Sequence, residues 1–272
     1  MSSIEAGRRC ELCPACGSAE SEAAPHELYD FCRECGSVYQ ARGIRSIQDY
    51  YEDLDRPPDN RHQIGSYRSY LEVVKSHVDF DPGVHFVDVG AGDGSFLACA
   101  REMFDLTNPH AVEGSAVARR LLAERGFDVV DVPTVVGFER KFVTALQVIE
   151  HVPDPVEFLE GFVLRTDDLV LLTSPSVDAV EFARYGREWK SYSPSHHLVL
   201  FSRQGIETVF DKASIDLIHF ELCISATNSI WASRLKTIRN SLWYPVRVVL
   251  KGQTRRPRFY GKNSFLAIGR RR

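Results

Sequence analysis

The sequence predicts an α/β fold in which a doubly wound parallel sheet follows a small, cysteine-rich N-terminal module. Two observations support this prediction. From His85 onward, short runs rich in β-branched and aromatic residues alternate with helical stretches, which is the pattern of a doubly wound sheet. Before that point, five of the seven cysteines lie within the first 35 residues, in a segment whose apolar pattern is too weak to form a core alone.

The elements of the sheet follow one another along the chain. Strands are expected within His85–Gly90, His110–Gly114, Phe127–Val132, Lys141–Ile149 and Asp168–Ser176. Helices are expected within Ser95–Phe104, Ala116–Gly126 and Pro155–Arg165 between them. A helix over Ser202–Lys212, capped by Ser202, then leads to a strand at Asp216–Leu222 and a terminal strand at Ser264–Gly269, because a serine before an apolar periodic run is a typical helix start.

The chain divides into three parts on this pattern. Residues 1–40 form the cysteine-rich module, residues 41–80 a helical lead-in, and residues 81–272 the main domain with a basic insertion at 225–263. The lead-in contains helical patterns at Ile47–Leu54 and Tyr67–Val78, which the turn-prone segment Asp55–Asn60 separates.

Composition is that of a globular protein, with 44% hydrophobic and 26% charged residues among 272. No apolar run approaches the roughly 20 residues needed to span a bilayer, and the first ten residues contain no signal-peptide core. We therefore expect a cytoplasmic protein without a transmembrane segment. The sequence does not indicate its oligomeric state.

The net charge of −4 conceals an uneven distribution. No acidic residue follows Glu221, whereas twelve basic residues do. These are Arg234, Lys236, Arg239, Arg247, Lys251, Arg255, Arg256, Arg258, Lys262, Arg270, Arg271 and Arg272. Such a region attracts anions, either a phosphate backbone or an anionic small substrate, unless it is simply a solvated charged face.

The cysteines follow a metal-binding spacing. Cys13 and Cys16 form one C-x-x-C-G turn, Cys32 and Cys35 form a second, and 15 residues separate the two turns. Two such turns supply four thiolates in a tetrahedral arrangement for zinc, and a four-thiolate site is closed and therefore structural. Redox-active cysteines are the alternative, and Cys10, three residues before Cys13, is a competing ligand.

A glycine-rich loop follows the first predicted strand of the main domain. Gly90, Gly92 and Gly94 let the backbone turn sharply and approach a ligand closely. The spacing is G-x-G-x-G, not the dinucleotide fingerprint, and Asp88 and Asp93 beside it would repel a pyrophosphate. S-adenosylmethionine fits this chemistry because it has no phosphate and carries an ammonium and a sulfonium that carboxylates favour.

The next two strand ends carry carboxylates as well. Glu113 follows Asp88 by 25 residues and is suited to accept hydrogen bonds from two ribose hydroxyls. Asp131, after the third predicted strand, is placed to lie near an adenine amino group.

Together, the glycine loop, Glu113, the segment Ala145–Pro155 and the segment Trp189–Ser202 resemble class I S-adenosylmethionine-dependent methyltransferases. The resemblance is above all to the branch of sugar and small-molecule methyltransferases, some with an N-terminal zinc-binding domain, and to ubiquinone-type O-methyltransferases. It covers residues 65–222 and the final strand. It implies a Rossmann-like seven-stranded sheet whose last strand is antiparallel.

The resemblance also implies roles for individual positions. The three glycines would line the methionine part of the cofactor, with Asp88 supporting the loop and reaching the amino group directly or through water, and Glu113 would hold the ribose. Asp93, within the same loop, is a further cofactor-binding candidate. Asp131 and Val132 would flank the adenine. Gln147 would lie near the methyl group, and Tyr67 near the cofactor carboxylate.

Three histidines are candidates for a general base, which a hydroxyl or activated-carbon acceptor requires. His196 and His197 precede the capped helix, and the resemblance favours this pair, with His197 matching the family histidine. His151 follows Glu150 at the fourth strand. Each of them could instead cap a helix or pack against an aromatic ring.

These observations predict methyl transfer to oxygen or carbon of a small, anionic acceptor such as a sugar nucleotide or a biosynthetic intermediate. An RNA methyltransferase that grips nucleic acid with the ribbon and the basic region is the first alternative. Residues Ala145–Val148 replace the Asn/Asp-Pro-Pro-Tyr motif of enzymes that methylate base amines, which disfavours it. A non-catalytic, S-adenosylmethionine-binding adaptor is the second.

Overall fold

The computed structural model describes residues 10–42, 59–79, 81, 83–163, 165–193, 196–223 and 262–272. The helix predicted at Ile47–Leu54 and all but two residues of the predicted insertion 225–263 lie outside these ranges. Among the described helices, none is both long and apolar enough to cross a membrane.

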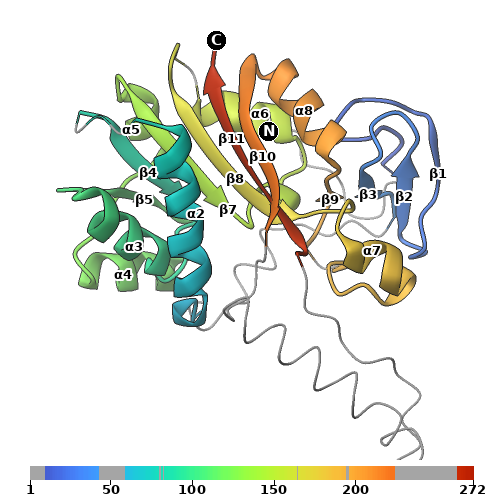
Figure 1. Ribbon diagram of the computed structural model, residues 1–272, viewed down its shortest axis with the longest axis horizontal. Coiled ribbons are helices and arrows are strands. Elements are labelled where there is room, and N and C mark those ends of the chain that lie inside the picture. The colour runs from blue at the N-terminus through green and yellow to red at the C-terminus, as the bar shows by residue number, and fades with distance from the viewer. Residues whose placement is uncertain are drawn as a thin grey trace, which may run out of the picture.

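A seven-stranded sheet forms the centre of the molecule (Figure 1), in the order β10-β11-β8-β7-β4-β5-β6. Its strands are β4 (His85–Val89), β5 (His110–Val112), β6 (Asp128–Val129), β7 (Lys141–Leu146), β8 (Leu169–Pro175), β10 (Ile215–Cys223) and β11 (Ser264–Arg271). Strands β6, β5, β4, β7 and β8 pair in parallel, and β11 runs antiparallel to both β8 and β10. The expected seven-stranded sheet with an antiparallel last strand is therefore confirmed.

Helices cover both faces of this sheet because its central strands are apolar on both sides. Helices α2 (Ile64–His77), α3 (Ser95–Phe104) and α4 (Ala116–Glu124) share one buried cluster with strand residues such as Phe86 and Phe142. Helices α5 (Val132–Gly137), α6 (Pro155–Phe162) and α8 (Arg203–Lys212) share the other with Val87 and Val143. Neighbouring residues of one strand thus enter opposite cores, as the alternation of side chains along a strand requires.

Helix starts follow the capping chemistry expected from the sequence. The Ser202 hydroxyl accepts a hydrogen bond from the Gly205 N–H, so α8 begins where the sequence predicted. Asp154 caps α6 in the same way, with Pro155 in the first turn.

A second sheet, of four strands, joins the N-terminal module to the main domain. Strands β1 (Ser21–Ala23), β2 (Tyr29–Cys32) and β3 (Val38–Gln40) form an antiparallel ribbon, and β9 (Val199–Leu200) from the main domain pairs with β3. Figure 1 shows this ribbon beside β9, α8 and the short helix α7 (Val180–Tyr185). The sequence did not predict β9 or this shared sheet, because a two-residue strand leaves no periodic pattern.

Candidate functional site

The glycine loop connects β4 to α3 in a conformation that requires glycine. Gly90 has a φ of +74° and Gly94 a φ of +73°, in the left-handed region that other residues rarely adopt. A Cβ on Gly90 would lie 2.6 Å from Cγ2 of Val148, which follows β7. The loop therefore packs its bare backbone against the end of the neighbouring strand. Gly92, between them, also has a positive φ, of +56°.

Glu113 follows β5 and holds the loop through its carboxylate. Oε2 accepts a hydrogen bond of 2.8 Å from the Gly92 N–H, and Oε1 accepts one of 2.8 Å from the Ser115 N–H. Each carboxylate oxygen retains a second lone pair, so both can still accept a hydroxyl of a bound ribose.

Asp88 is a buried carboxyl at the end of β4, 3% exposed. Burial raises its pKa to about 7, an effect that the hydrogen bond from the Thr144 hydroxyl opposes and the nearby Glu113 charge reinforces. The Thr144 oxygen lies 2.6 Å from Oδ1 of Asp88. A ligand ammonium beside this carboxyl would stabilise its ionised form.

Asp93 and Tyr67 support the loop from the α2 side. Asp93 accepts hydrogen bonds from the backbone N–H groups of Ser95 and Asn60, both 3.0 Å long. The Tyr67 ring packs against Phe96 with centroids 5.4 Å apart. Burial raises the pKa of Tyr67, and the charges of Asp88 and Asp93 raise it further, so the hydroxyl lies within the field of both carboxylates.

The remaining predicted cofactor residues lie at the ends of β6 and β7. Asp131 caps α5, and hydrogen bonds from Thr134 lower its pKa. Val132 follows in the first turn and is 40% exposed. Gln147 has a φ of +58°, and its Nε2 donates to the Thr173 hydroxyl at 3.3 Å. Because parallel strands end at one edge, these groups border the same edge as the glycine loop.

The three candidate histidines converge at this edge. The ring centroid of His151 lies 5.2 Å from that of His196 and 5.0 Å from that of His197, and the centroids of His196 and His197 are 4.6 Å apart. Nδ1 of His151 lies 2.8 Å from the His196 carbonyl oxygen, and Nδ1 of His197 lies 2.8 Å from the Ser191 carbonyl oxygen. A nitrogen that faces a carbonyl donates its hydrogen, so these two contacts put the lone pair on Nε2 in His151 and His197.

Burial makes these imidazoles weak bases. It lowers the pKa of His197 to about 3 and that of His196 to about 4, with the neighbouring His151 adding to both effects. Burial lowers the pKa of His151 as well. All three rings are therefore neutral at neutral pH.

Glu150 completes the cluster, although the sequence did not predict it as a site residue. It lies in the 3₁₀ turn Ile149–His151 and is 0% exposed. Burial raises its pKa to about 8, which the nearby Ser174 hydroxyl opposes. Within the described part of the chain, neither carboxyl oxygen has a hydrogen-bond partner of ordinary geometry. The available signal was a carboxyl placed directly before His151 in an otherwise apolar segment.

The ribbon holds the segment that carries His197. The Tyr29 hydroxyl donates to the His197 carbonyl oxygen at 2.8 Å, and the Gln40 N–H donates to the Leu198 carbonyl oxygen at 2.8 Å. The Leu198 N–H donates in turn to the Glu150 carbonyl oxygen at 2.7 Å. The N-terminal module and the histidine cluster are therefore connected by direct hydrogen bonds.

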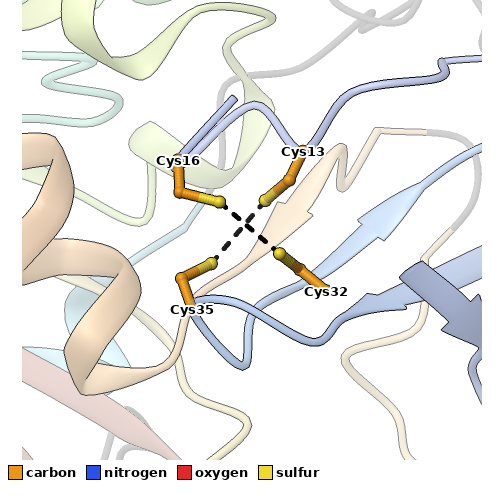
Figure 2. A group of neighbouring side chains, drawn as sticks. All are labelled: Cys13, Cys16, Cys32 and Cys35. Carbon is orange, nitrogen blue, oxygen red and sulfur yellow. Dashed lines mark hydrogen bonds between the residues drawn. The ribbon is translucent and has the colours of Figure 1, made fainter. Parts of the chain in front are cut away.

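The four predicted zinc ligands point toward a common centre (Figure 2). Sγ of Cys13 lies 3.7 Å from Sγ of Cys35, and Sγ of Cys16 lies 3.5 Å from Sγ of Cys32. Thiolates about 2.3 Å from a tetrahedral zinc ion are about 3.8 Å apart, so this arrangement fits zinc. Cys10 is not part of the group, and its thiol donates to the Leu12 carbonyl oxygen.

Comparison with known proteins identifies the family. A family model described as a methyltransferase domain matches residues 62–220, more than half of the chain. No curated protein matches the sequence. A chain from the complex between the Trm112 methyltransferase activator of Haloferax volcanii and a methyltransferase is similar in structure. It is 14% identical, with a TM-score of 0.51, and the match covers 84% of this chain and 98% of that one.

A second solved structure, of an S-adenosylmethionine-dependent methyltransferase from Anabaena variabilis, is 10% identical with a TM-score of 0.50. That match covers 80% of this chain and 98% of the other. Similarity at such low identity shows the shared fold. The family match and the sheet order together establish that this chain belongs to the methyltransferase-domain family and is an S-adenosylmethionine-dependent methyltransferase with the class I α/β fold.

Proposed function

We propose that the protein transfers a methyl group to oxygen or carbon of a small, anionic acceptor such as a sugar nucleotide or a biosynthetic intermediate. The observation that carries this proposal is the meeting of two groups of residues at one edge of the sheet. The glycine loop with Glu113 offers a cofactor cradle, which we call the cofactor half of the site. The histidine cluster around Glu150, which we call the acceptor half, lies at the adjoining strand end. Val148 links them, because it contacts Gly90 and directly precedes the turn that carries Glu150.

The cofactor half would hold S-adenosylmethionine, which supplies a methyl group already activated by sulfonium. Asp88 is placed to bind the amino group, Glu113 the ribose hydroxyls, and Asp131 and Val132 the adenine. Gln147 borders the reacting methyl group. The chain's contribution is then mainly to orient the acceptor for in-line attack and to exclude water.

The acceptor half would bind the second substrate against neutral, polar side chains. His197 remains our proposal for the group that takes the acceptor proton, with His196 and His151 as alternatives, because each neutral ring offers one nitrogen lone pair. Their lowered pKa values make them weak bases, which suits an acceptor whose hydroxyl is itself acidic.

The zinc site is proposed to be structural. A Cys13, Cys16, Cys32 and Cys35 centre has no open position for substrate. Its role would be to fold the ribbon and thereby to hold the segment that carries His197.

Titration calorimetry with S-adenosylhomocysteine tests the cofactor half. We expect Glu113→Ala to weaken binding by about 10- to 100-fold, because it removes charge-assisted hydrogen bonds. Glu124→Ala is the matched control, since Glu124 is an exposed glutamate on the following helix. A folded wild-type protein that does not bind S-adenosylhomocysteine would refute the proposal.

The acceptor half needs a separate test. Candidate acceptors are incubated with S-adenosylmethionine, and products heavier by one methylene are sought by mass spectrometry. If cells in which His196 and His197 are both alanine retain every methylated product, the adaptor alternative is favoured. Retardation of RNA that weakens steeply with salt would favour the RNA alternative, for which the basic residues after Glu221 are the supporting observation.

A further inference from the structure

Glu150 presents a problem that the cofactor site does not explain. Its carboxyl group is fully buried, and within the described residues neither oxygen has a hydrogen-bond partner of ordinary geometry. An unpartnered buried carboxyl costs several kcal/mol unless something compensates it. By contrast, Asp88, Asp93 and Glu113 at the same edge each accept at least one hydrogen bond.

Two imidazoles lie close to this carboxyl. One ligand atom each from Glu150, His151 and His197 can be chosen so that all lie within 4.8 Å of one another. We propose that these three side chains bind a divalent transition-metal cation, at a second metal site distinct from the four-cysteine centre.

The donor set indicates the class of ion. Two imidazole nitrogens and one carboxylate oxygen suit zinc, manganese or ferrous iron, whereas an all-oxygen set would suit magnesium or calcium. Ligands about 2.1 Å from a common ion lie roughly 3.4 Å apart in tetrahedral geometry, so binding would draw together ligand atoms that now lie within 4.8 Å of one another. Three protein ligands leave at least one coordination position open, as in catalytic metal sites.

The surroundings orient both rings for this role. Metal-binding histidines almost always donate their second ring N–H to a carbonyl or carboxylate, which fixes the ring and directs the other nitrogen at the ion. Nδ1 of His151 is held by the His196 carbonyl oxygen, and Nδ1 of His197 by the Ser191 carbonyl oxygen, each at 2.8 Å. The ion would in turn supply the positive partner that the Glu150 carboxylate lacks.

The role of the ion rests on the proposed function, although its binding does not. An acceptor hydroxyl in the open position would lose its proton to water more readily, because a bound cation lowers the pKa of its oxygen ligand. The oxygen lone pair then forms the bond to the methyl carbon, and the electrons of the carbon–sulfur bond return to sulfur, which leaves as a neutral thioether. If this ion binds, His151 and His197 are its ligands, and water takes the acceptor proton in place of the His197 base of the proposed function.

The test counts metal ions on the full-length protein with its ribbon zinc retained. Purified protein is titrated with Mn²⁺, which competes poorly with zinc for thiolates, and bound Mn²⁺ is followed by electron paramagnetic resonance. We expect one Mn²⁺ per chain in addition to the ribbon zinc. Glu150→Gln and His197→Ala should each weaken Mn²⁺ binding on the order of 100-fold while keeping the zinc.

His196→Ala is the matched control, because His196 lies beside the other two rings but is outside the ligand group. It should retain Mn²⁺ binding. Affinity for S-adenosylhomocysteine, measured on the same samples, shows whether each variant is folded and separates this inference from the proposed function.

Two results would overturn the inference. One is a wild-type protein that binds S-adenosylhomocysteine but holds no ion beyond the ribbon zinc when offered Mn²⁺, Zn²⁺ or Co²⁺. The other is a second ion that survives in both Glu150→Gln and His197→Ala. If Glu150→Gln does not fold, His197→Ala still decides the question, because its change lies in a different segment.

Discussion

The glycine loop and the histidine cluster border the same edge of the sheet, yet they are stabilised by contacts of different range. In the loop, Asp93 bonds to Ser95 two residues away, and Glu113 bonds to Ser115 and to Gly92 across neighbouring strands. In the cluster, the His197 carbonyl oxygen is held by Tyr29, 168 residues distant in sequence. The cofactor half is thus held by contacts within the main domain, such as the one between Asp88 and Thr144, whereas the acceptor half also depends on the N-terminal ribbon.

Loss of the proposed ribbon zinc should have the largest effect, and it should impair the acceptor half far more than the cofactor half. We expect Cys32→Ser to lose the zinc ion, because it removes one of the four thiol ligands. The ribbon would then lose a contribution to its folding on the order of 10 kcal/mol. Methyl transfer should fall at least about tenfold as the Tyr29 and β3 contacts to the histidine segment are lost, while S-adenosylhomocysteine affinity stays within about threefold. Zinc analysis, turnover and calorimetry measure these effects.

Cys10→Ser is the control for this variant, and it should keep the zinc because Cys10 lies outside the four-thiol group. If cofactor affinity collapses together with turnover in Cys32→Ser, the two halves are not independent.

Gly90→Ala should damage the cofactor half. The new Cβ would be forced to a φ of +74° and would lie 2.6 Å from a Val148 methyl group. We expect the free energy of unfolding to fall by about 3 kcal/mol, from backbone strain and overpacking together. Urea unfolding measures this loss.

Gly114→Ala serves for comparison, since a Cβ there meets nothing within 4 Å. Gly114→Ala should change the free energy of unfolding by no more than about 0.5 kcal/mol. Equal destabilisation by both variants would show that the loop geometry is not the cause.

Asp88 should make the cofactor half sensitive to pH. Its pKa is about 7 in the folded protein against 3.8 as the ordinary value, so the folded state binds the proton more tightly. This contribution to stability is complete at low pH and is lost as the pH rises from about 4 through 7. The free energy of unfolding of Asp88→Asn should therefore rise relative to that of the wild type over that interval, by about 4 kcal/mol at neutral pH, because each pKa unit corresponds to about 1.4 kcal/mol.

Unfolding at a series of pH values, beside the exposed control Asp79→Asn, measures the difference. A constant offset between Asp88→Asn and the wild type across the interval would contradict the buried, proton-binding carboxyl. An equal rise in the free energy of unfolding of Asp79→Asn would point to a general effect of net charge.

Two tyrosines in one aromatic cluster give the smallest and most specific comparison. Their rings lie 4.9 Å apart, and only Tyr29 donates to the His197 carbonyl oxygen. Among the residues that the structure describes, the buried Tyr192 hydroxyl has no partner. Tyr29→Phe should lower the free energy of unfolding by about 1 kcal/mol and slow turnover. Tyr192→Phe should leave the free energy of unfolding unchanged or raise it slightly.

Both variants are compared by urea unfolding and by turnover at saturating cofactor. A Tyr29→Phe enzyme with unchanged turnover would mean that the ribbon does not position the histidine segment.

Most of the main domain was predictable because its signals are local. The alternation of strands and helices gave the doubly wound sheet, and Ser202 marked the start of α8. The cysteine spacing identified four thiols that the structure brings within 4.8 Å. Each of these depends on residues a few positions apart, or on a repeat of such patterns.

The functional groups that were not predicted depend on contacts between distant segments. Glu150 is significant because its buried carboxyl group has no hydrogen-bond partner of ordinary geometry among the described residues, and a sequence does not show burial of a single polar side chain. Tyr29 and β9 matter only because the ribbon docks on the main domain.

The sequence alone therefore determined the fold class, the glycine loop and the set of four neighbouring thiols, because periodicity, glycine conformation and cysteine spacing are properties of short segments. Only the tertiary structure decided that three histidines and an unpartnered glutamate meet at one place, and that the ribbon holds them there. That outcome depends on long-range packing, in which side chains far apart in the sequence lose water together and must find partners in one another.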